Sequence, residues 1–253
     1  MPDRLYGLGK VFPGRESEGR AALSAGSDKA MLQLRERAAA ESRTRRRGVE
    51  QHIRFPAGDV VLEGLVSLPE PAARIGVVVC HPHPLYGGEM HNNVVEGLVI
   101  SLRKAGHATL RFNFRGVGGS SGEHGDGIAE IDDVKGAVSY LQQRQPFESI
   151  VVAGYSFGSM VGMRAGADDP RVDRLIGIAL PIARRDASFL ENTAKPKLFV
   201  SGDRDDHSPL PMLETLCARI PGPKQLVAIS GADHFFRSRE IEVADAALRF
   251  IDG

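Results

Sequence analysis

The most informative stretch of the chain reads Ile150-Val151-Val152-Ala153-Gly154-Tyr155-Ser156-Phe157-Gly158. Its first four residues form an apolar run typical of a strand buried on both faces, and a helical pattern follows from Met160. Between them lies the pattern G-x-S-x-G, which in a strand–turn–helix setting holds a serine above the edge of a sheet. We therefore predict that Ser156 is a nucleophile and that the Phe157 amide, at the helix start, faces a developing negative charge. The alternative is a glycine-rich turn with an incidental serine.

Apolar strands and amphipathic helices alternate on both sides of this stretch. This alternation predicts an α/β fold with a mostly parallel central sheet and helices on both faces. In such sheets the functional residues lie on loops at the carboxyl ends of the strands. Strands are expected at 60–66, 75–80, 108–112, 150–153, 175–180, 197–201 and 225–229, and helices at 92–105, 128–143, 160–167, 210–219 and 241–251.

Composition narrows the class of protein. The 253 residues include 42% apolar and 25% charged residues, as in an ordinary globular protein, and the formal net charge is zero. Because the net charge is zero, overall electrostatic attraction does not favour nucleic acid or an acidic membrane as a partner. Two cysteines exclude a disulfide framework, and no apolar stretch approaches the roughly 20 residues that span a bilayer. With no signal-peptide pattern at the N-terminus, we expect a soluble cytoplasmic protein; the sequence gives no indication of its oligomeric state.

Residues 1–50 differ from the rest, with eleven Lys and Arg against seven Asp and Glu. We predict a basic N-terminal extension, partly helical or disordered, followed by one domain over 51–253. A tether for an anionic partner is the alternative interpretation of the extension.

A serine hydroxyl needs a base, and in a fold of this kind the chain order is serine, acid, histidine. Only His207 and His234 follow Ser156. His234 stands directly after the last expected strand and before the last helix, so it is predicted to be the base. His207 is expected to be a surface residue of the loop that supplies the acid.

The acid is expected just after the strand at 197–201, where three aspartates compete. Asp205 is preferred because its distance from the strand end leaves the turn room to bend toward the histidine loop. Asp203 is the second choice, with a structural role in the turn, and Asp206 is expected to face solvent. Asp233 is a weaker candidate because it adjoins the histidine in sequence.

A second donor for the negative charge is expected in the loop after the strand at 75–80. Pro82 and Pro84 have no N–H group to donate. The amides of His83, Leu85 and Tyr86 remain, and Leu85 is preferred.

Two other patterns suggest cofactors. His81, His83 and His91 invite a metal site, but no accompanying ligand pattern supports one, so we expect no metal and assign His81 and His83 to shaping the pocket. The glycine-rich stretch 116–122 lacks the Gly-Lys-Ser/Thr ending of a phosphate-binding loop and fits the dinucleotide pattern poorly. We expect a tight loop bordering the site and no organic cofactor.

Taken together, four motifs resemble those of a group of small lidless bacterial α/β-hydrolases, which are dienelactone-hydrolase-like or carboxylesterase-like. The resemblance covers about residue 51 to the end and rests on His81-Pro82-His83-Pro84 with Gly87-Gly88, Leu110-Arg111-Phe112-Asn113-Phe114-Arg115-Gly116, Gly154-Tyr155-Ser156-Phe157-Gly158 and Gly231-Ala232-Asp233-His234-Phe235-Phe236. It implies an α/β-hydrolase fold and the same triad of Ser156, Asp205 and His234. Nothing in it extends to the first 50 residues.

These observations lead to three hypotheses about function. The first is a serine hydrolase that cleaves ester or thioester bonds of small to medium acyl substrates, because only a short excursion fits between Pro181 and Pro196, with no large lid domain. The second is a peptidase, lactonase or acyltransferase with the same triad, since one acyl-enzyme serves them all. The third is a hydrolase-like interaction domain without catalysis.

Overall fold

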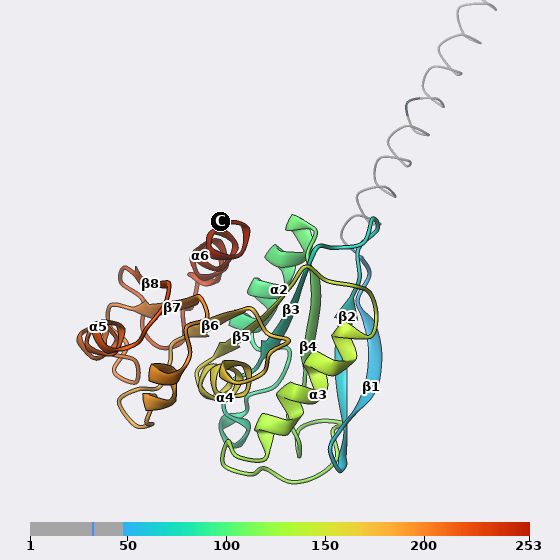
Figure 1. Ribbon diagram of the computed structural model, residues 1–253, viewed down its shortest axis with the longest axis horizontal. Helices are drawn as coiled ribbons and strands as arrows, with labels where there is room; N and C mark the ends of the chain where they lie inside the picture. Colours follow the sequence, from blue (N-terminus) through green and yellow to red (C-terminus); the bar gives the residue numbers. More distant parts are fainter. Residues whose placement is uncertain (1–31, 33–47) are drawn as a thin grey trace, which may run out of the picture. The chain divides into compact units, whose positions relative to one another are not determined.

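The computed structural model describes Leu32 and residues 48–253 (Figure 1). The described residues from 48 onward belong to one compact unit. The predicted basic extension lies almost wholly outside the described residues and stays a prediction.

One sheet of eight strands forms the centre of the unit, in the order β1-β2-β4-β3-β5-β6-β7-β8. β2 pairs antiparallel with β1 and β4, and all strands from β4 to β8 pair in parallel. The strands are β1 (Gln51–Ala57), β2 (Val60–Ser67), β3 (Ile75–Cys80), β4 (Ala108–Phe112), β5 (Ser149–Tyr155), β6 (Arg174–Ile178), β7 (Lys197–Gly202) and β8 (Lys224–Ile229).

Helices cover both faces of the sheet, as predicted (Figure 1). Side chains of α2 and α6 share one buried cluster, and those of α3, α4 and α5 share another on the opposite face. The helical elements are η1 (Pro84–Tyr86), α2 (Asn93–Ala105), α3 (Glu130–Gln142), α4 (Phe157–Ala167), η2 (Ser188–Asn192), α5 (Leu210–Arg219) and α6 (Glu240–Asp252).

The central strands read as unbroken apolar runs because both of their faces are covered. In β3, Val77 and Val79 pack into the cluster of α2 and α6, whereas Val78 packs into the opposite cluster. All three side chains are at most 2% exposed. Successive strand residues thus fill both cores, which fixes the register of the parallel strands.

α2 begins and ends where its sequence indicates. The Asn92 side chain accepts a hydrogen bond from the Val94 amide, a cap that stabilises a helix by about 1 kcal/mol. Gly106 ends the helix in the left-handed conformation, with φ 91°, and its amide donates to the carbonyls of Arg103 and Leu102.

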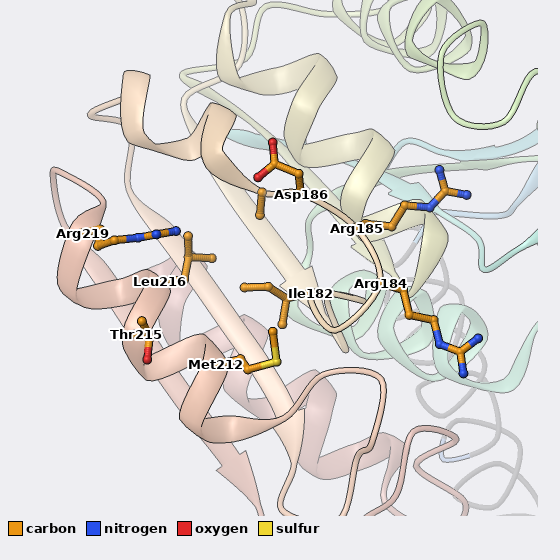
Figure 2. Close-up of a pocket in the computed structure, with 9 residues that line it drawn as sticks. Ile182, Arg184, Arg185, Asp186, Met212, Thr215, Leu216 and Arg219 are labelled. Carbon is orange, nitrogen blue, oxygen red and sulfur yellow. The ribbon is translucent and has the colours of Figure 1, made fainter.

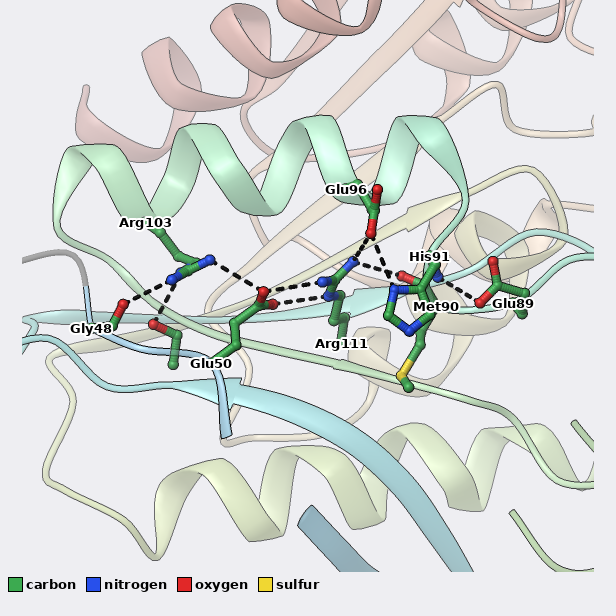
Figure 3. A network of polar contacts seen from close by, with 9 residues as sticks. Gly48, Glu50, Glu89, Met90, His91, Glu96, Arg103 and Arg111 are labelled. Atoms are coloured by element: carbon green, nitrogen blue, oxygen red, sulfur yellow. Dashed lines mark hydrogen bonds and ion pairs between the residues drawn. The ribbon is translucent and has the colours of Figure 1, made fainter. Parts of the chain in front are cut away.

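A network of charged side chains attaches the chain before β1 to α2 and β4 (Figure 3). Glu50 receives two hydrogen bonds from Arg111, of 2.9 and 3.0 Å, and one of 3.2 Å from Arg103. Arg111 also contacts Glu96 at 3.0 Å, and Arg103 donates to the Gly48 carbonyl at 2.8 Å. Because the Arg111 side chain is only 7% exposed, these contacts compensate a largely buried charge.

The expected elements agree with the observed ones except at a few places. β1 was not expected to be a strand; it is an edge strand, and only Phe55 and Ala57 of it are buried. β6 ends at Ile178 rather than residue 180, because Ala179 adopts φ 48°. No helix among the described residues combines the length and apolarity needed to cross a bilayer.

Candidate active site

Ser156 lies on the sharp turn between β5 and α4. Its backbone has φ 54° and ψ −118°, a strained conformation for a residue with a side chain. A Cβ on Gly154 would lie 2.1 Å from the Gly158 carbonyl oxygen, and one on Gly158 would lie 2.3 Å from that of His81. The Ser156 amide donates to the Ile178 carbonyl at 2.8 Å, which holds the turn against β6. Both glycines of the pattern are therefore needed for the turn to form.

The ring of His234 lies beside this serine. Its Nε2 is 2.9 Å from Ser156 Oγ, and its Nδ1 is 2.8 Å from Asp205 Oδ2. With Nδ1–H donating to the carboxylate, Nε2 is free to accept the serine proton. The Tyr155 hydroxyl donates to the His234 carbonyl at 2.8 Å and fixes the backbone of the histidine loop. The structure thus brings the three residues predicted for the triad into one hydrogen-bonded series.

Asp205 is held in place by its own loop. It is 4% exposed, and its Oδ1 accepts hydrogen bonds from the amides of His207 at 2.8 Å and Ser208 at 3.0 Å. These bonds orient the carboxylate toward the His234 ring. A carboxylate in this position fixes the tautomer of the histidine and stabilises the imidazolium that forms when it accepts a proton.

The other aspartates of the two loops have different partners. Asp203 Oδ1 accepts from the Gly231 amide at 2.8 Å and so joins the turn after β7 to the turn after β8. Asp233 Oδ1 accepts from the Phe235 amide at 2.9 Å within its own turn. Asp206 is exposed. The structural role foreseen for Asp203 and the exposure foreseen for Asp206 are both observed.

Two of the three candidate amides in the loop after β3 donate hydrogen bonds within that loop. The Leu85 amide donates to Nδ1 of His83 at 3.3 Å, and the Tyr86 amide donates to the His83 carbonyl at 3.1 Å. Among residues 48–253, the His83 amide has no hydrogen-bond partner. The centroid of the His83 ring lies 4.7 Å from that of the Phe157 ring. The turn at η1 therefore uses the amides of Leu85 and Tyr86 for its own hydrogen bonds. The amide of His83, which the sequence left as an alternative to the preferred Leu85, remains available as a donor.

His81 is a buried residue that hydrogen-bonds two loops near the site, in line with the pocket-shaping role expected from the sequence. Its Nδ1 donates to the Pro82 carbonyl at 2.6 Å, and its Nε2 accepts from the Phe114 amide at 3.0 Å. Burial lowers the pKa of His81 to about 4, so the ring is neutral near pH 7. His81 therefore joins the loops after β3 and β4. No group of three or more His, Cys, Asp or Glu in the described part of the chain is arranged to hold a metal ion.

The glycine-rich loop after β4 is packed against β2. Glu63 accepts hydrogen bonds of 2.6 Å from the Gly119 amide and from the Asn113 side chain. The Ser121 amide donates to the Val61 carbonyl at 2.9 Å. The loop is thus held against β2 by hydrogen bonds, and the Gly119 amide is already paired with a carboxylate.

Two histidines that the sequence did not single out as functional border the site. The His207 ring lies 4.6 Å from the His234 ring, and the His124 ring lies 5.5 Å from that of Phe157. Nδ1 of His124 is 2.8 Å from a carboxylate oxygen of the fully buried Glu130. Both histidines lie in irregular loops, where no periodicity or motif indicates their neighbours.

The chain is similar in sequence and structure to several known proteins. Residues 72–198 match the family model described as serine aminopeptidase, S33. An uncharacterized protein of Rickettsia prowazekii is 36% identical over 185 residues, which make up 70% of this chain and 77% of that protein. An alpha-beta serine hydrolase homologue from Coxiella burnetii is 34% identical, with a TM-score of 0.72 over 79% of this chain and 96% of that one. A serine hydrolase without a lid from Xanthomonas campestris is 32% identical, with a TM-score of 0.72 over 80% of this chain and 94% of that one.

The chain is a lidless α/β serine hydrolase. The resemblance and the fold class inferred from the sequence are thereby confirmed. In this hydrolase the connection from β6 to β7 contains only the short helix η2, within the described residues. The carboxyl ends of β3, β5, β7 and β8 supply the loops around Ser156, so the sheet positions every group of the candidate site.

Proposed function

We propose that this hydrolase cleaves carboxylic ester or thioester bonds of small to medium acyl substrates. Ser156 is the nucleophile, His234 the general base and acid, and Asp205 the group that orients His234. The proposal is carried by the continuous contacts of 2.9 Å and 2.8 Å from Ser156 Oγ through the imidazole to the carboxylate.

Acylation begins when Ser156 Oγ attacks the acyl carbon and His234 Nε2 takes its proton. The carbonyl π pair moves to oxygen, and the amides of Phe157 and His83 donate to the resulting oxyanion. As the intermediate collapses, the bond to the leaving alcohol or thiol breaks, and that group takes the proton from His234. The product of this half is an ester between the acyl group and Ser156.

Deacylation repeats the same steps with water. His234 removes a proton from the water as its oxygen attacks the acyl carbon, and the same two amides stabilise the second oxyanion. The bond to Ser156 Oγ then breaks, and the proton on His234 returns to that oxygen. The acid leaves and the enzyme is restored, with no metal or organic cofactor required by this sequence of steps.

The preference for small and medium acyl groups is supported by the short connection between β6 and β7. A site without a covering domain buries little of a long chain, so additional methylene groups gain little binding energy. The expected cytoplasmic location stays a prediction, consistent with the free thiols of Cys80 and Cys217.

The test is a panel of 4-nitrophenyl esters and matched thioesters of increasing chain length, assayed with the wild type and Ser156→Ala. We expect the highest kcat/KM for chains of about two to eight carbons and a loss of about 10³-fold or more in the variant. Full activity in Ser156→Ala contradicts the mechanism, and rates that peak on long-chain triglycerides contradict the substrate size.

A peptidase is the second candidate, favoured by the description of the matching family as a serine aminopeptidase. The same triad would cleave an amide if the leaving amine were protonated by His234. Adding 4-nitroanilides of single amino acids to the panel separates the two functions. A kcat/KM for these amides above that for the esters supports the peptidase and contradicts the esterase proposal.

A further inference from the structure

A cavity of about 480 Å³ opens between the loop after β6 and α5 (Figure 2). The floor of the cavity is apolar and consists of three side chains that point toward one another, those of Ile182, Met212 and Leu216. Met212 is 42% exposed, so its side chain adds accessible apolar surface to the cavity. The volume falls within the range of small-molecule sites, so the floor could hold a short apolar segment of a ligand.

Arg184 and Arg185 lie at one side of this floor, and their side chains extend outward from it in different directions (Figure 2). Arg184 has no ion pair or hydrogen bond from its side chain to any described residue, and Arg185 donates only to the carbonyl oxygen of Asp126, at 3.3 Å. Both side chains belong to exposed residues. Among residues 48–253, no carboxylate therefore neutralises either guanidinium.

The rim carries two other charged side chains, Arg219 and Asp186. Arg219, on the opposite side of the floor, lies 3.3 Å from a carboxylate oxygen of Glu191. Asp186 accepts hydrogen bonds from the amide and hydroxyl of Ser188, which lower its pKa, with a further contribution from the nearby charge of Arg164. With Arg219 paired, the two unpaired arginines outnumber the single carboxylate of Asp186, so the lining carries an excess of one positive charge.

The segment that carries these arginines is attached to the histidine side of the candidate active site. The Ala183 amide donates to the His207 carbonyl at 3.2 Å. The His207 ring in turn lies 4.6 Å from the ring of His234. Ala183, which lies between the lining residues Ile182 and Arg184, is therefore joined to the loop whose His207 ring packs against His234.

The same segment also reaches the oxyanion side. The Asp126 carbonyl that accepts from Arg185 belongs to the loop that carries His124, and the His124 ring packs against Phe157 at 5.5 Å. The charge of Arg185 is close enough to contribute to lowering the pKa of His83, after burial and His124. Arg185 is therefore joined to the loop whose His124 ring packs against Phe157.

We propose that this cavity is a substrate subsite for a small ester or thioester that carries a carboxylate. The apolar floor takes a short hydrocarbon segment, and Arg184 and Arg185 bind the carboxylate at its end. Guanidinium groups match a carboxylate in geometry and remain charged at any physiological pH. This inference rests on the proposed function of Ser156 and specifies the class of substrate for that same site.

Two pairs of substrates of similar size test the proposal. Monomethyl adipate against methyl hexanoate places the charge on the acyl side, and 4-carboxyphenyl butyrate against phenyl butyrate places it on the alcohol side. For each pair the readout is the ratio of kcat/KM for the charged substrate to that for the neutral one. We expect this ratio to fall about tenfold in Arg184→Gln/Arg185→Gln for at least one pair. Raising the salt from about 0.02 to about 0.5 M should lower the same ratio in the wild type, and less in the variant.

Arg74→Gln is the matched control, since Arg74 is an exposed arginine paired with Glu148 before the amino end of β3. We expect both ratios to stay at their wild-type values in this control. The inference is overturned if the double variant keeps both wild-type ratios, or if the control lowers them equally. Turnover of the neutral esters by the wild type but not by Ser156→Ala would then leave the proposed function standing. Failure of the wild type to cleave any of the four esters overturns both.

Discussion

Replacing His83 with proline removes the one amide of the β3 loop that we propose as the second oxyanion donor. His83 has φ −59° and ψ 122°, so the ring of proline, which requires φ near −65°, fits the existing backbone. The amide has no hydrogen-bond partner in the described part of the chain, so no bond of the resting fold is lost with it. The substitution also removes the imidazole that accepts from the Leu85 amide, and this loss needs its own control.

The size of the effect follows from the role of the amide. A donor to an oxyanion acts mainly in the transition state, and removing one lowers kcat by about 10²–10³-fold, or about 2.7–4 kcal/mol. We expect this loss in kcat for His83→Pro, with a much smaller change in KM, because the neutral carbonyl of the ground state needs the donor less. His83→Ala keeps the amide but loses the ring and its packing against Phe157, so we expect a loss of no more than about tenfold.

The assay is steady-state hydrolysis of 4-nitrophenyl butyrate by the wild type and both variants. Thermal unfolding of each variant checks that the proline is accommodated. A folded His83→Pro enzyme with the same kcat as His83→Ala would refute the assignment of the His83 amide. It would return attention to Leu85, whose amide would then have to leave the His83 ring during turnover.

Three further predictions concern the acid, a buried histidine and the network before β1. Asp205→Asn should lower kcat by about 10³–10⁴-fold. Asp203→Asn should remain active, because the amide oxygen of asparagine can still accept from the Gly231 amide. Equal losses of kcat in the two variants would contradict the choice of Asp205. The pKa of His81 is 6.5 in the unfolded chain and about 4 in the folded protein. The unfolded state therefore binds more protons below pH 6.5. The hydrolase should lose about 3 kcal/mol of stability as the pH falls from 6.5 to 4. Urea unfolding across that range should show a smaller loss in His81→Gln, and an equal loss would count against the buried neutral ring. Glu50→Gln removes the carboxylate that Arg111 and Arg103 share, leaving Arg111 with Glu96 alone, and should cost about 2–4 kcal/mol in the same assay. Glu148→Gln, in an exposed ion pair, should change little, and similar midpoints for the two variants would refute the structural role of Glu50.

Most of the fold was predictable because local pattern and tertiary environment agree. The run Val77-Val78-Val79 is apolar throughout because α2 and α3 cover both faces of β3, and Asn92 and Gly106 mark the ends of a helix by their own chemistry. β1 was not predicted because it is an edge strand with one neighbour and few buried side chains. Its strand character depends on pairing with β2 rather than on its own residues.

Some residues of the candidate site could likewise be predicted from the sequence, and others could not. Ser156, Asp205 and His234 could be chosen from motif and chain order, since the order of strands fixes which loops meet. The choice between Leu85 and His83 could not, because it depends on which amides the turn at η1 uses for itself. The proximity of His207 to His234 likewise arises from the folding of two loops that are far apart in sequence.

The nucleophilic role of Ser156 is the central claim, and covalent labelling tests it most directly. The folded hydrolase is treated with a fluorophosphonate probe, and the modified peptide is identified by mass spectrometry, alongside Ser156→Ala and His234→Ala. The account predicts one label per chain on Ser156, none in Ser156→Ala, and labelling slowed by at least about 10³-fold in His234→Ala. A folded wild-type protein that takes up no label, or takes it up on another residue, would contradict the account.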